Sequence, residues 1–348
     1  MVDISYAANA AKPGVVGQQS PSRFARPHGV KMCDHPDTQD GEPDSSYEAK
    51  VDRRLAEVLS PQTRTEGLVS AETRAKLERF RVQNRSGNEV YRIPLEDSSD
   101  DFIIVKLLPN WQVELRRLRK ALLRSLIYGE RSVDYSRGKK RAAMETSRYR
   151  EWQAAGMSVP SLIETDLADV RIIQGLQFPT FQAFLSSEDR SVNDKLRAIS
   201  AGLDAISHQH RFAISQDKDG LVHAEPSPQN MMFDPETDQV YWFDLEHPAE
   251  YAHMSVEDVA TRALRIYLYG ALDFLPDHTG NILALAVERY EPKALLWRVA
   301  DSVERSLNSF LIRTARLLGL RQRSSAVQGR MVRQLRATLH EWEGSTPG

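Results

Sequence analysis

The sequence predicts an α+β fold in two lobes, a small strand-rich lobe followed by a larger helical lobe. Runs of β-branched and aromatic residues, separated by turn residues, are concentrated between residues 79 and 109. Beyond Phe178 the apolar residues recur mainly at helical spacing. At 348 residues the chain is long enough for one large domain or two moderate ones with a sizeable core.

Composition narrows the class of protein. The chain is 41% hydrophobic and 27% charged, and its formal net charge of -2 argues against a dedicated nucleic-acid-binding surface. The single cysteine, Cys33, excludes an internal disulfide and fits a reducing compartment. No apolar run approaches the roughly 18 residues of a transmembrane helix, and the N-terminus has no secretory-signal pattern. We therefore expect a soluble, cytoplasmic protein without a transmembrane segment.

Residues 1–48 are predicted to form a disordered arm. They are rich in Pro, Gly, Ser, Asp and Gln and have no periodic apolar pattern, so they cannot bury enough apolar surface to offset the entropy of ordering. His28, Cys33 and His35 lie in this arm. Three such side chains in a flexible segment are more often there by chance than as a metal site.

Residues 49–176 are predicted to form the first lobe with its leading helices. The expected elements are two helices within 47–80, two strands within 79–95 around a turn at 84–88, a strand at 100–109, helices at 111–128 and 137–155, and strands at 158–164 and 169–176. Pro109 should end the third strand, because proline cannot donate to a sheet. Gly156 should end the helix before it, because glycine accepts the left-handed conformation of a helix end.

Residues 177–340 are predicted to form the helical lobe. The apolar spacing at 194–212 indicates a long helix ahead of a polar segment, "HAEPSPQNMMFDPETDQVYWFDLEHP", at 223–248. A further helix should begin at Ser255 or Asp258, since either residue can cap a helix N-terminus.

Within the polar segment, Asn230 and Asp244 form a candidate Mg²⁺ site. Asp244 follows the strand-like run "QVYWF", and Asn230 lies in a loop whose Pro226 and Pro228 exclude regular helix. Carboxylate and amide oxygens suit Mg²⁺, which completes its shell with phosphate oxygens and water. The alternative interpretation is an Asx-turn and a strand-end aspartate, both of which are common.

Glu225 is the candidate acid–base residue. It lies five residues before Asn230, where a carboxylate could accept a proton from an attacking hydroxyl while metal ions neutralise the phosphates. His223, two residues earlier, is interpreted as a packed structural histidine.

Taken together, these residues resemble a known family. The order of histidine, any residue, acid, four residues, asparagine, and then an apolar strand ending in aspartate is similar to the catalytic and metal-binding loops of protein-kinase-like folds. The resemblance is closest to the atypical branch of RIO kinases, lipopolysaccharide-core kinases and aminoglycoside phosphotransferases. Their loop reads approximately His-Gly-Asp-x-x-x-x-Asn, whereas this sequence has "HAEPSPQN", with Glu225 in place of the aspartate.

The resemblance extends upstream and implies a nucleotide site with ATP and Mg²⁺ as cofactors. Lys106, at the end of the third strand, would hold the nucleotide phosphates, and Glu145 would pair with Lys106. Glu151, nearer the end of the same helix, is the rival for this pairing. Backbone groups around Ile173 and Gly175 would meet the adenine.

The implied activity is an ATP- and Mg²⁺-dependent phosphotransferase acting on a hydroxyl of a protein, lipid, glycan or small molecule. Two departures leave a pseudokinase scaffold as the alternative. Glu225 carries one methylene more than the family's aspartate, and Gly87 is the only glycine in the first turn. The metal-site stretch also reads "FDLE" rather than Asp-Phe-Gly. Transfer of another part of the nucleotide, such as AMP, is a third hypothesis.

The stretch 116–150 is strongly basic, with leucines at helical spacing and arginines opposite them. A solvated amphipathic face is the simpler interpretation. The rival interpretation is a docking surface for an acidic partner, whether phospholipid, nucleic acid or protein.

Overall fold

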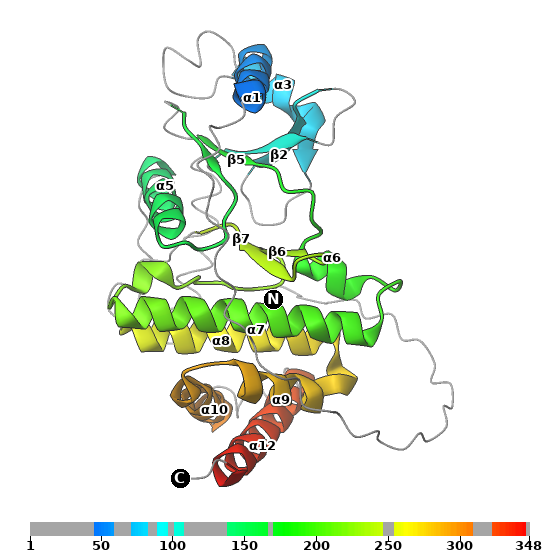
Figure 1. The fold of residues 1–348 in the computed structure, drawn as a ribbon, viewed down its shortest axis with the longest axis vertical. Helices are drawn as coiled ribbons and strands as arrows, with labels where there is room; N and C mark the ends of the chain where they lie inside the picture. The colour runs from blue at the N-terminus through cyan, green and yellow to red at the C-terminus, as the bar shows by residue number, and fades with distance from the viewer. Residues whose placement is uncertain are drawn as a thin grey trace. The chain divides into compact units, whose positions relative to one another are not determined.

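A small antiparallel sheet and a larger set of helices give the chain a mixed α+β structure, as expected (Figure 1). The computed structural model describes residues 45–58, 71–82, 89–96, 101–107, 138–165, 170–245, 254–308 and 322–345. The elements below belong to one compact unit, which spans residues 46–348.

Several predicted features lie outside the described residues. They are the arm up to residue 44, the turn at 84–88, the helix expected at 111–128 and the basic residues 116–137. Helix α1 begins at Ser45 and therefore overlaps the last residues of the arm predicted at 1–48.

The sheet has five antiparallel strands in the order β1-β2-β3-β5-β4. Their bounds are β1 Arg81–Val82, β2 Glu89–Pro94, β3 Phe102–Leu107, β4 Leu162–Ile163 and β5 Val170–Gln174. All five fall within the stretches predicted to be strands. Lys106 on β3 pairs directly with Val90 on β2 and with Arg171 on β5. Because antiparallel partners point to the same face, these three side chains share one side of the sheet.

The other face of the sheet is apolar and packs against two helices, α1 (Ser45–Val58) and α3 (Ala71–Leu77). Helix α3 is followed directly by the short 3-10 helix η1 (Glu78–Phe80). The buried cluster there consists of Val51, Val58, Leu77, Tyr91, Ile93, Leu95, Ile103, Val105, Leu107, Val170 and Ile172. The two-residue alternation of β3 therefore turns Lys106 away from this core.

Helix α5 (Gly138–Ala154) connects β3 to β4 in the chain and corresponds to the helix predicted at 137–155. Gly156 ends it at a φ of +71°. The Gly156 N–H donates to Gln153 and the Met157 N–H to Trp152, which is the hydrogen-bond pattern of a Schellman motif. The predicted stop at Gly156 is confirmed.

A two-stranded hairpin, β6 (Met231–Asp234) and β7 (Gln239–Trp242), follows in the polar segment. The strand at β7 was expected, whereas "MMFD" was not recognised as its partner. Met231 pairs with Trp242, so Asn230 and Phe243 lie opposite each other at the open end of the hairpin. In Figure 1 the hairpin lies between the five-stranded sheet and helix α7.

The remaining elements are helical. They are α6 (Phe181–Ser186), α7 (Val192–Ser215), η2 (Asp219–Leu221), α8 (Val256–Phe274), η4 (Pro276–His278), α9 (Thr279–Arg289), α10 (Lys293–Asn308) and α12 (Gln322–Ser345). Ser191 and Asp194 form a capping box at α7. Ser255 caps α8 by accepting from the Asp258 N–H, which decides between the two expected starts.

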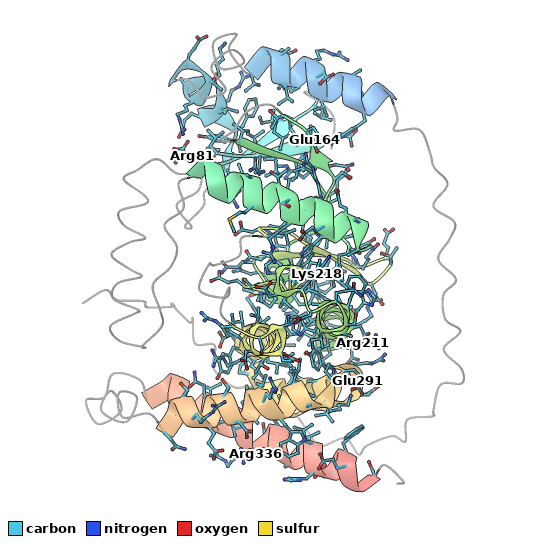
Figure 2. The ribbon with its side chains drawn as sticks, turned by 90° about the vertical axis from the view of Figure 1, so that its left-hand side faces the viewer. Arg81, Glu164, Arg211, Lys218, Glu291 and Arg336 are labelled. Atoms are coloured by element: carbon cyan, nitrogen blue, oxygen red, sulfur yellow. The ribbon has the colours of Figure 1, made fainter. Side chains whose placement is uncertain are left out.

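The helices share one large apolar core, which also takes in one face of the hairpin. Figure 2 shows charged side chains such as Arg211, Lys218 and Glu291 on the outside of these elements. Among the described residues, none of the helices has the length and apolarity needed to cross a membrane.

One buried polar pair lies inside this core. His210 on α7 is fully buried, and its Nδ1 lies 2.7 Å from the hydroxyl of Tyr290. Its Nε2 has no hydrogen-bond partner within the described part of the chain. Burial lowers the pKa of His210 to about 3, so the ring stays neutral in the folded protein at physiological pH.

We expect His210 to make the protein less stable as the pH falls. In the unfolded chain the ring binds a proton near pH 6.5, whereas in the folded protein it stays neutral down to about pH 3. The unfolded state therefore gains protons first, and the free energy of unfolding should drop by about 1 kcal/mol between pH 7 and 5.5. Urea unfolding should show this loss in the parent and in the control His340→Gln, which changes an exposed histidine. His210→Gln should not show it. An equal loss in His210→Gln would contradict the assignment.

Candidate functional site

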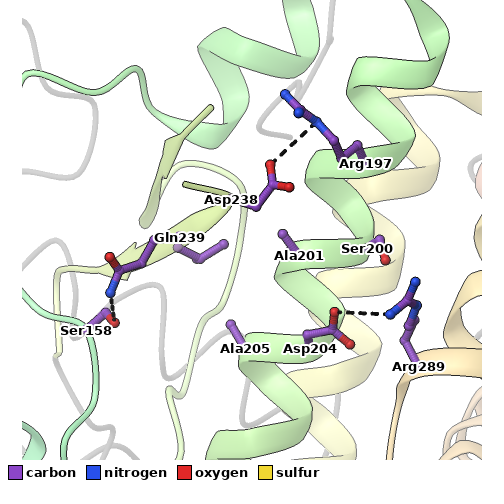
Figure 3. Close-up of a pocket in the computed structure, with 10 residues that line it drawn as sticks. Ser158, Arg197, Ser200, Ala201, Asp204, Ala205, Asp238, Gln239 and Arg289 are labelled. Atoms are coloured by element: carbon purple, nitrogen blue, oxygen red, sulfur yellow. Dashed lines mark hydrogen bonds and ion pairs between the residues drawn. The ribbon is translucent and has the colours of Figure 1, made fainter. Parts of the chain in front are cut away.

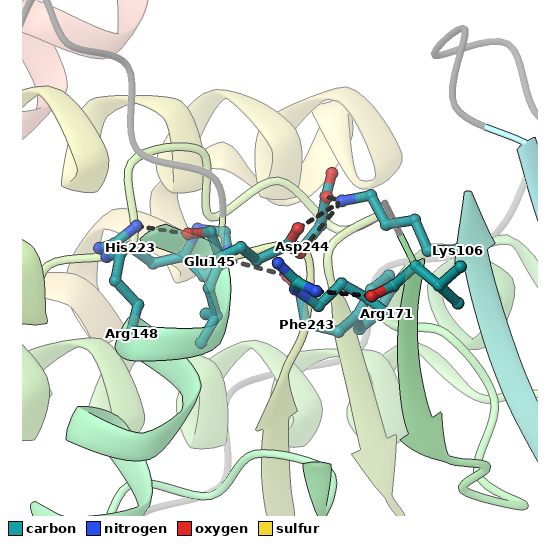
Figure 4. A network of polar contacts seen from close by, with 9 residues as sticks. Lys106, Glu145, Arg148, Arg171, His223, Phe243 and Asp244 are labelled. Carbon is teal, nitrogen blue, oxygen red and sulfur yellow. Dashed lines mark hydrogen bonds and ion pairs between the residues drawn. The ribbon is translucent and has the colours of Figure 1, made fainter. Parts of the chain in front are cut away.

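Lys106 lies at the centre of a cluster of charges (Figure 4). Its Nζ lies 3.1 and 3.3 Å from the two carboxylate oxygens of Glu145, and it also forms an ion pair with Asp244. The side chains of Lys106 and Glu145 are 12% and 4% exposed, so both charges are largely withdrawn from water. Such burial is costly for each charge alone, and the three groups offset one another.

Helix α5 supplies Glu145 from the face that it buries. Arg148, Tyr149 and Trp152 lie three, four and seven residues after Glu145, on the same helix face, and all four residues are buried. Glu151 falls on the exposed side of the same helix. The structure therefore brings Glu145 to Lys106, and leaves its rival Glu151 away from that contact.

Asp244 follows β7 with its backbone in the left-handed region, at a φ of +60°. Aspartate tolerates this conformation better than most residues, yet a surrounding structure must hold it there. Tyr149, which is fully buried, contacts the Asp244 backbone, and burial beside Glu145 raises its pKa well above the usual range. The Asp244 side chain is 32% exposed, so it faces Lys106 on one side and is open to solvent on the other.

His223 connects the polar loop to the strand end beside Asp244. Its Nε2 donates to the carbonyl of Phe243, 2.9 Å away, and its Nδ1 accepts from the Glu225 N–H. The ring is buried against Trp152 and Trp242. These contacts give His223 a structural position, as the sequence suggested.

The loop fixes the backbone of Glu225 and leaves its side chain exposed. The Asn230 Nδ2 donates to the Glu225 carbonyl at 2.9 Å, and the Ser227 N–H donates to the same oxygen at 2.7 Å. On α8, a Cβ at Gly270 would lie 2.5 Å from Pro228, so glycine lets this loop approach the helix closely.

Asn230 and Asp244 are held at the same end of the hairpin. The Phe243 N–H donates to the Asn230 carbonyl at 3.2 Å, directly before Asp244. Because the Asn230 Nδ2 is engaged with Glu225, the amide oxygen is left as its acceptor group. Within the described part of the chain, no group of three or more His, Cys, Asp or Glu side chains could hold a metal ion.

Ile173 and Gly175 lie at the end of β5 and just beyond it. Ile173 pairs with Ile104 and shares the sheet face of Lys106. The Gly175 N–H donates to the Phe102 carbonyl at 2.8 Å and is therefore already used within the protein. A Cβ at Gly175 would lie 2.2 Å from the Phe102 ring, so only glycine fits there.

Sequence reasoning missed Arg148, Trp152 and Arg171. The first two share the helix face of Glu145, and the helical spacing from Glu145 could have identified them. Arg171 sits opposite Lys106 in the sheet, and burial lowers its pKa, while the Glu145 carboxylate opposes that shift. Its place is set by strand register, which the sequence does not reveal.

A polar pocket lies elsewhere, between α7 and the β6–β7 turn (Figure 3). Arg197 pairs with Asp238 across 3.4 Å, and Arg289 lies 3.9 Å from Asp204, whose pKa burial raises. All four side chains are about half exposed, so these pairs are screened by solvent. None of the predicted site residues lines this pocket.

Comparison with known proteins assigns no family. No protein-family model matches the sequence, and no curated protein is significantly similar to it.

We expect Glu145→Gln to destabilise the protein and Glu151→Gln to leave it nearly unchanged. The first change removes a buried charge that pairs with Lys106, which should cost about 2 to 3 kcal/mol in the free energy of unfolding. The second alters an exposed residue on the same helix and should stay within about 0.5 kcal/mol. Urea unfolding at pH 7 measures both variants. Equal effects would show that the buried pair contributes nothing beyond the helix itself.

Proposed function

We propose that this protein is an ATP- and Mg²⁺-dependent phosphotransferase that acts on a hydroxyl acceptor. The observation that carries the proposal is the contact of Lys106 with both Glu145 and Asp244. In protein kinases, phosphoryl transfer requires a lysine held by a glutamate and an aspartate that binds the metal close to it. The three residues come from a strand, a helix and a strand end that lie far apart in the sequence.

We further propose that the chain has a two-lobed, protein-kinase-like fold. The first lobe, residues 49–176, would contain the five-stranded sheet with α1, α3 and α5. The second lobe, residues 177–340, would contain the hairpin together with the helices before and after it. In this arrangement Lys106 belongs to the first lobe and Asp244 to the second, and the nucleotide would bind where they meet.

The residues around Lys106 fit a nucleotide. Val90, Ile104 and Ile173 share its sheet face and present an aliphatic surface suited to a base. Lys106 itself would exchange its contact with Asp244 for the phosphates, which leaves the aspartate free to bind a metal ion. Backbone groups around Ile173 and Gly175 would orient the adenine, and they exclude the N–H groups of Gln174 and Gly175, which already donate to Ser161 and Phe102.

The residues that would hold Mg²⁺ are Asp244 and Asn230. Both offer oxygen atoms at the open end of the hairpin, and a carboxylate with an amide oxygen is a donor set that Mg²⁺ accepts. When bound, the ion would neutralise the phosphate charge that develops during transfer.

Glu225 would orient the acceptor hydroxyl and accept its proton at the carboxylate. Two hydrogen bonds to its carbonyl fix the backbone, and the side chain is exposed, so it can meet a substrate that arrives from solvent. The acceptor is a hydroxyl of a protein, lipid, glycan or small molecule. A docking surface for an acidic partner stays the rival interpretation of the basic stretch 116–150, beside a solvated amphipathic face.

A pseudokinase scaffold is the second candidate. It is favoured by the identity and position of Glu225, a longer carboxylate than the aspartate of the family that this sequence resembles, on an exposed loop. A misplacement of about 1 Å can lower a rate by about 100-fold. In that case the protein would bind nucleotide or a partner without turnover.

We expect Asp244→Ala to abolish turnover of ATP in the presence of Mg²⁺, because the variant loses the carboxylate that would bind the metal. It should also lose the rise in melting temperature that MgATP gives the parent, since a ligand that binds only the folded state raises it. Thermal shift and ATP hydrolysis, with chelator and Asp258→Ala as controls, measure both effects. Unchanged turnover in Asp244→Ala would remove this residue from the site.

Glu225 distinguishes the two candidates. For an enzyme, Glu225→Gln should keep the thermal shift with MgATP but lower turnover by roughly 10² to 10⁴, the contribution of a positioned acid–base group. Glu225→Asp should retain measurable activity. For a scaffold, neither variant should change turnover or the thermal shift. A Glu225→Gln protein that hydrolyses ATP as fast as an active parent would end the catalytic assignment.

A further inference from the structure

Arg148 is a buried arginine on α5, one helical turn beyond Glu145. The residue is 6% exposed, and its side chain makes four hydrogen bonds to three backbone carbonyls. Nε and Nη2 donate to Gly220 at 2.9 and 2.5 Å, Nη2 also donates to Val222 at 2.9 Å, and Nη1 donates to Leu245 at 2.6 Å. One guanidinium therefore contacts two segments of chain at once.

In the chain, those carbonyls lie just before and just after the segment that contains His223, Glu225, Asn230 and Asp244. Gly220 and Val222 lie immediately before His223, at the start of the loop that carries Glu225. Leu245 directly follows Asp244, so its carbonyl constrains the backbone that holds the aspartate in the left-handed region. Arg148 thus fixes two segments relative to α5, the helix that bears Glu145. One segment lies just before the Glu225 loop, and the other lies just after Asp244.

A second side chain on the same helix face supports part of this contact. The Trp152 indole N–H donates to the Gly220 carbonyl at 3.0 Å, one turn beyond Arg148. Its ring also contacts His223 and Trp242 in edge-on geometry. Trp152 reaches the loop before His223, and no hydrogen bond joins it to Leu245 in the part of the chain described here.

The chemistry of arginine suits this position. Burial lowers the pKa of Arg148 to about 10, so the group stays charged at neutral pH and needs oxygen partners. Its planar fork of five donors can bridge three carbonyls, whereas lysine offers one nitrogen that cannot span both segments. Replacing buried charged groups by apolar residues of similar volume is often neutral or stabilising, and in some proteins the charged groups serve to fix one geometry.

We propose that Arg148 is a positioning residue that holds α5 against the segment before His223 and the segment after Asp244, a set of contacts called the latch below. With these contacts in place, the Lys106, Glu145 and Asp244 cluster is assembled before any ligand binds. The catalytic consequence rests on the proposed phosphotransfer, but the latch itself does not. A protein with such a latch needs no activating partner or modification to bring Glu145 to Lys106.

The test compares hydrogen exchange of the full-length, ligand-free protein with four variants. Arg148→Met and Arg148→Lys should speed exchange at least about tenfold in peptides covering residues 219–225 and 243–245, while α8 to α10 keep the parent's protection. Trp152→Phe should affect only the 219–225 peptide. Arg150→Met is the matched control, because Arg150 lies on the same helix in an exposed pair with Glu164, and it should leave both peptides unchanged.

Hydrolysis of ATP with Mg²⁺ supplies a readout that a merely structural role would not move. Arg148→Lys should lower kcat by about 10- to 100-fold with little change in the KM for ATP, since loop geometry is lost while the sheet face is kept. If the parent turns over no ATP, phosphotransfer fails and the exchange data alone decide the latch. Unchanged exchange at both peptides in Arg148→Lys, or a uniform rise throughout the protein, would overturn the proposal. Should Arg148→Met fail to fold, Arg148→Lys and Trp152→Phe carry the test.

Discussion

The placement of the Lys106 ammonium between two carboxylates is the constraint on which the candidate site depends. A charge that is only 12% exposed must find partners within the protein, and these partners come from α5 and from the end of β7. The contacts of Lys106 thereby connect the sheet, helix α5 and the end of the hairpin. Loss of Lys106 would leave two carboxylates without their shared cation, whereas loss of either carboxylate would leave Lys106 with a single partner.

Helix α5 contributes most of the side chains that connect these elements. A single helix face carries Glu145 toward the sheet, Tyr149 toward the Asp244 backbone, and Arg148 and Trp152 toward the two loops. Because buried side chains donate to backbone carbonyls of both segments, these segments cannot shift without breaking several hydrogen bonds. Rigid support of this kind is what a site that works by positioning and charge neutralisation requires.

The loop of Glu225 combines a fixed backbone with an exposed side chain. Hydrogen bonds from Asn230 and Ser227 hold its carbonyl, and the close approach of Pro228 to Gly270 seats the loop on α8. Hydrogen bonds therefore hold the backbone, while the Glu225 side chain is exposed. That combination suits an acceptor-orienting group, and it equally suits a recognition residue on a scaffold.

Local features of this protein were readable from the sequence. Helical spacing located α5, Gly156 located its end, Ser255 was one of two marked starts for α8, and the β-branched run around residues 103–105 located β3 with Lys106 near its end. What pairs with Lys106 was decided by the tertiary structure, which joins it to Glu145 across 39 residues and to Asp244 across 138. The sequence left Glu151 as a rival and gave no sign of the Arg148 contacts or of β6 as a strand. Periodicity specifies which face of an element is buried, but only the packing of distant segments decides which buried groups meet.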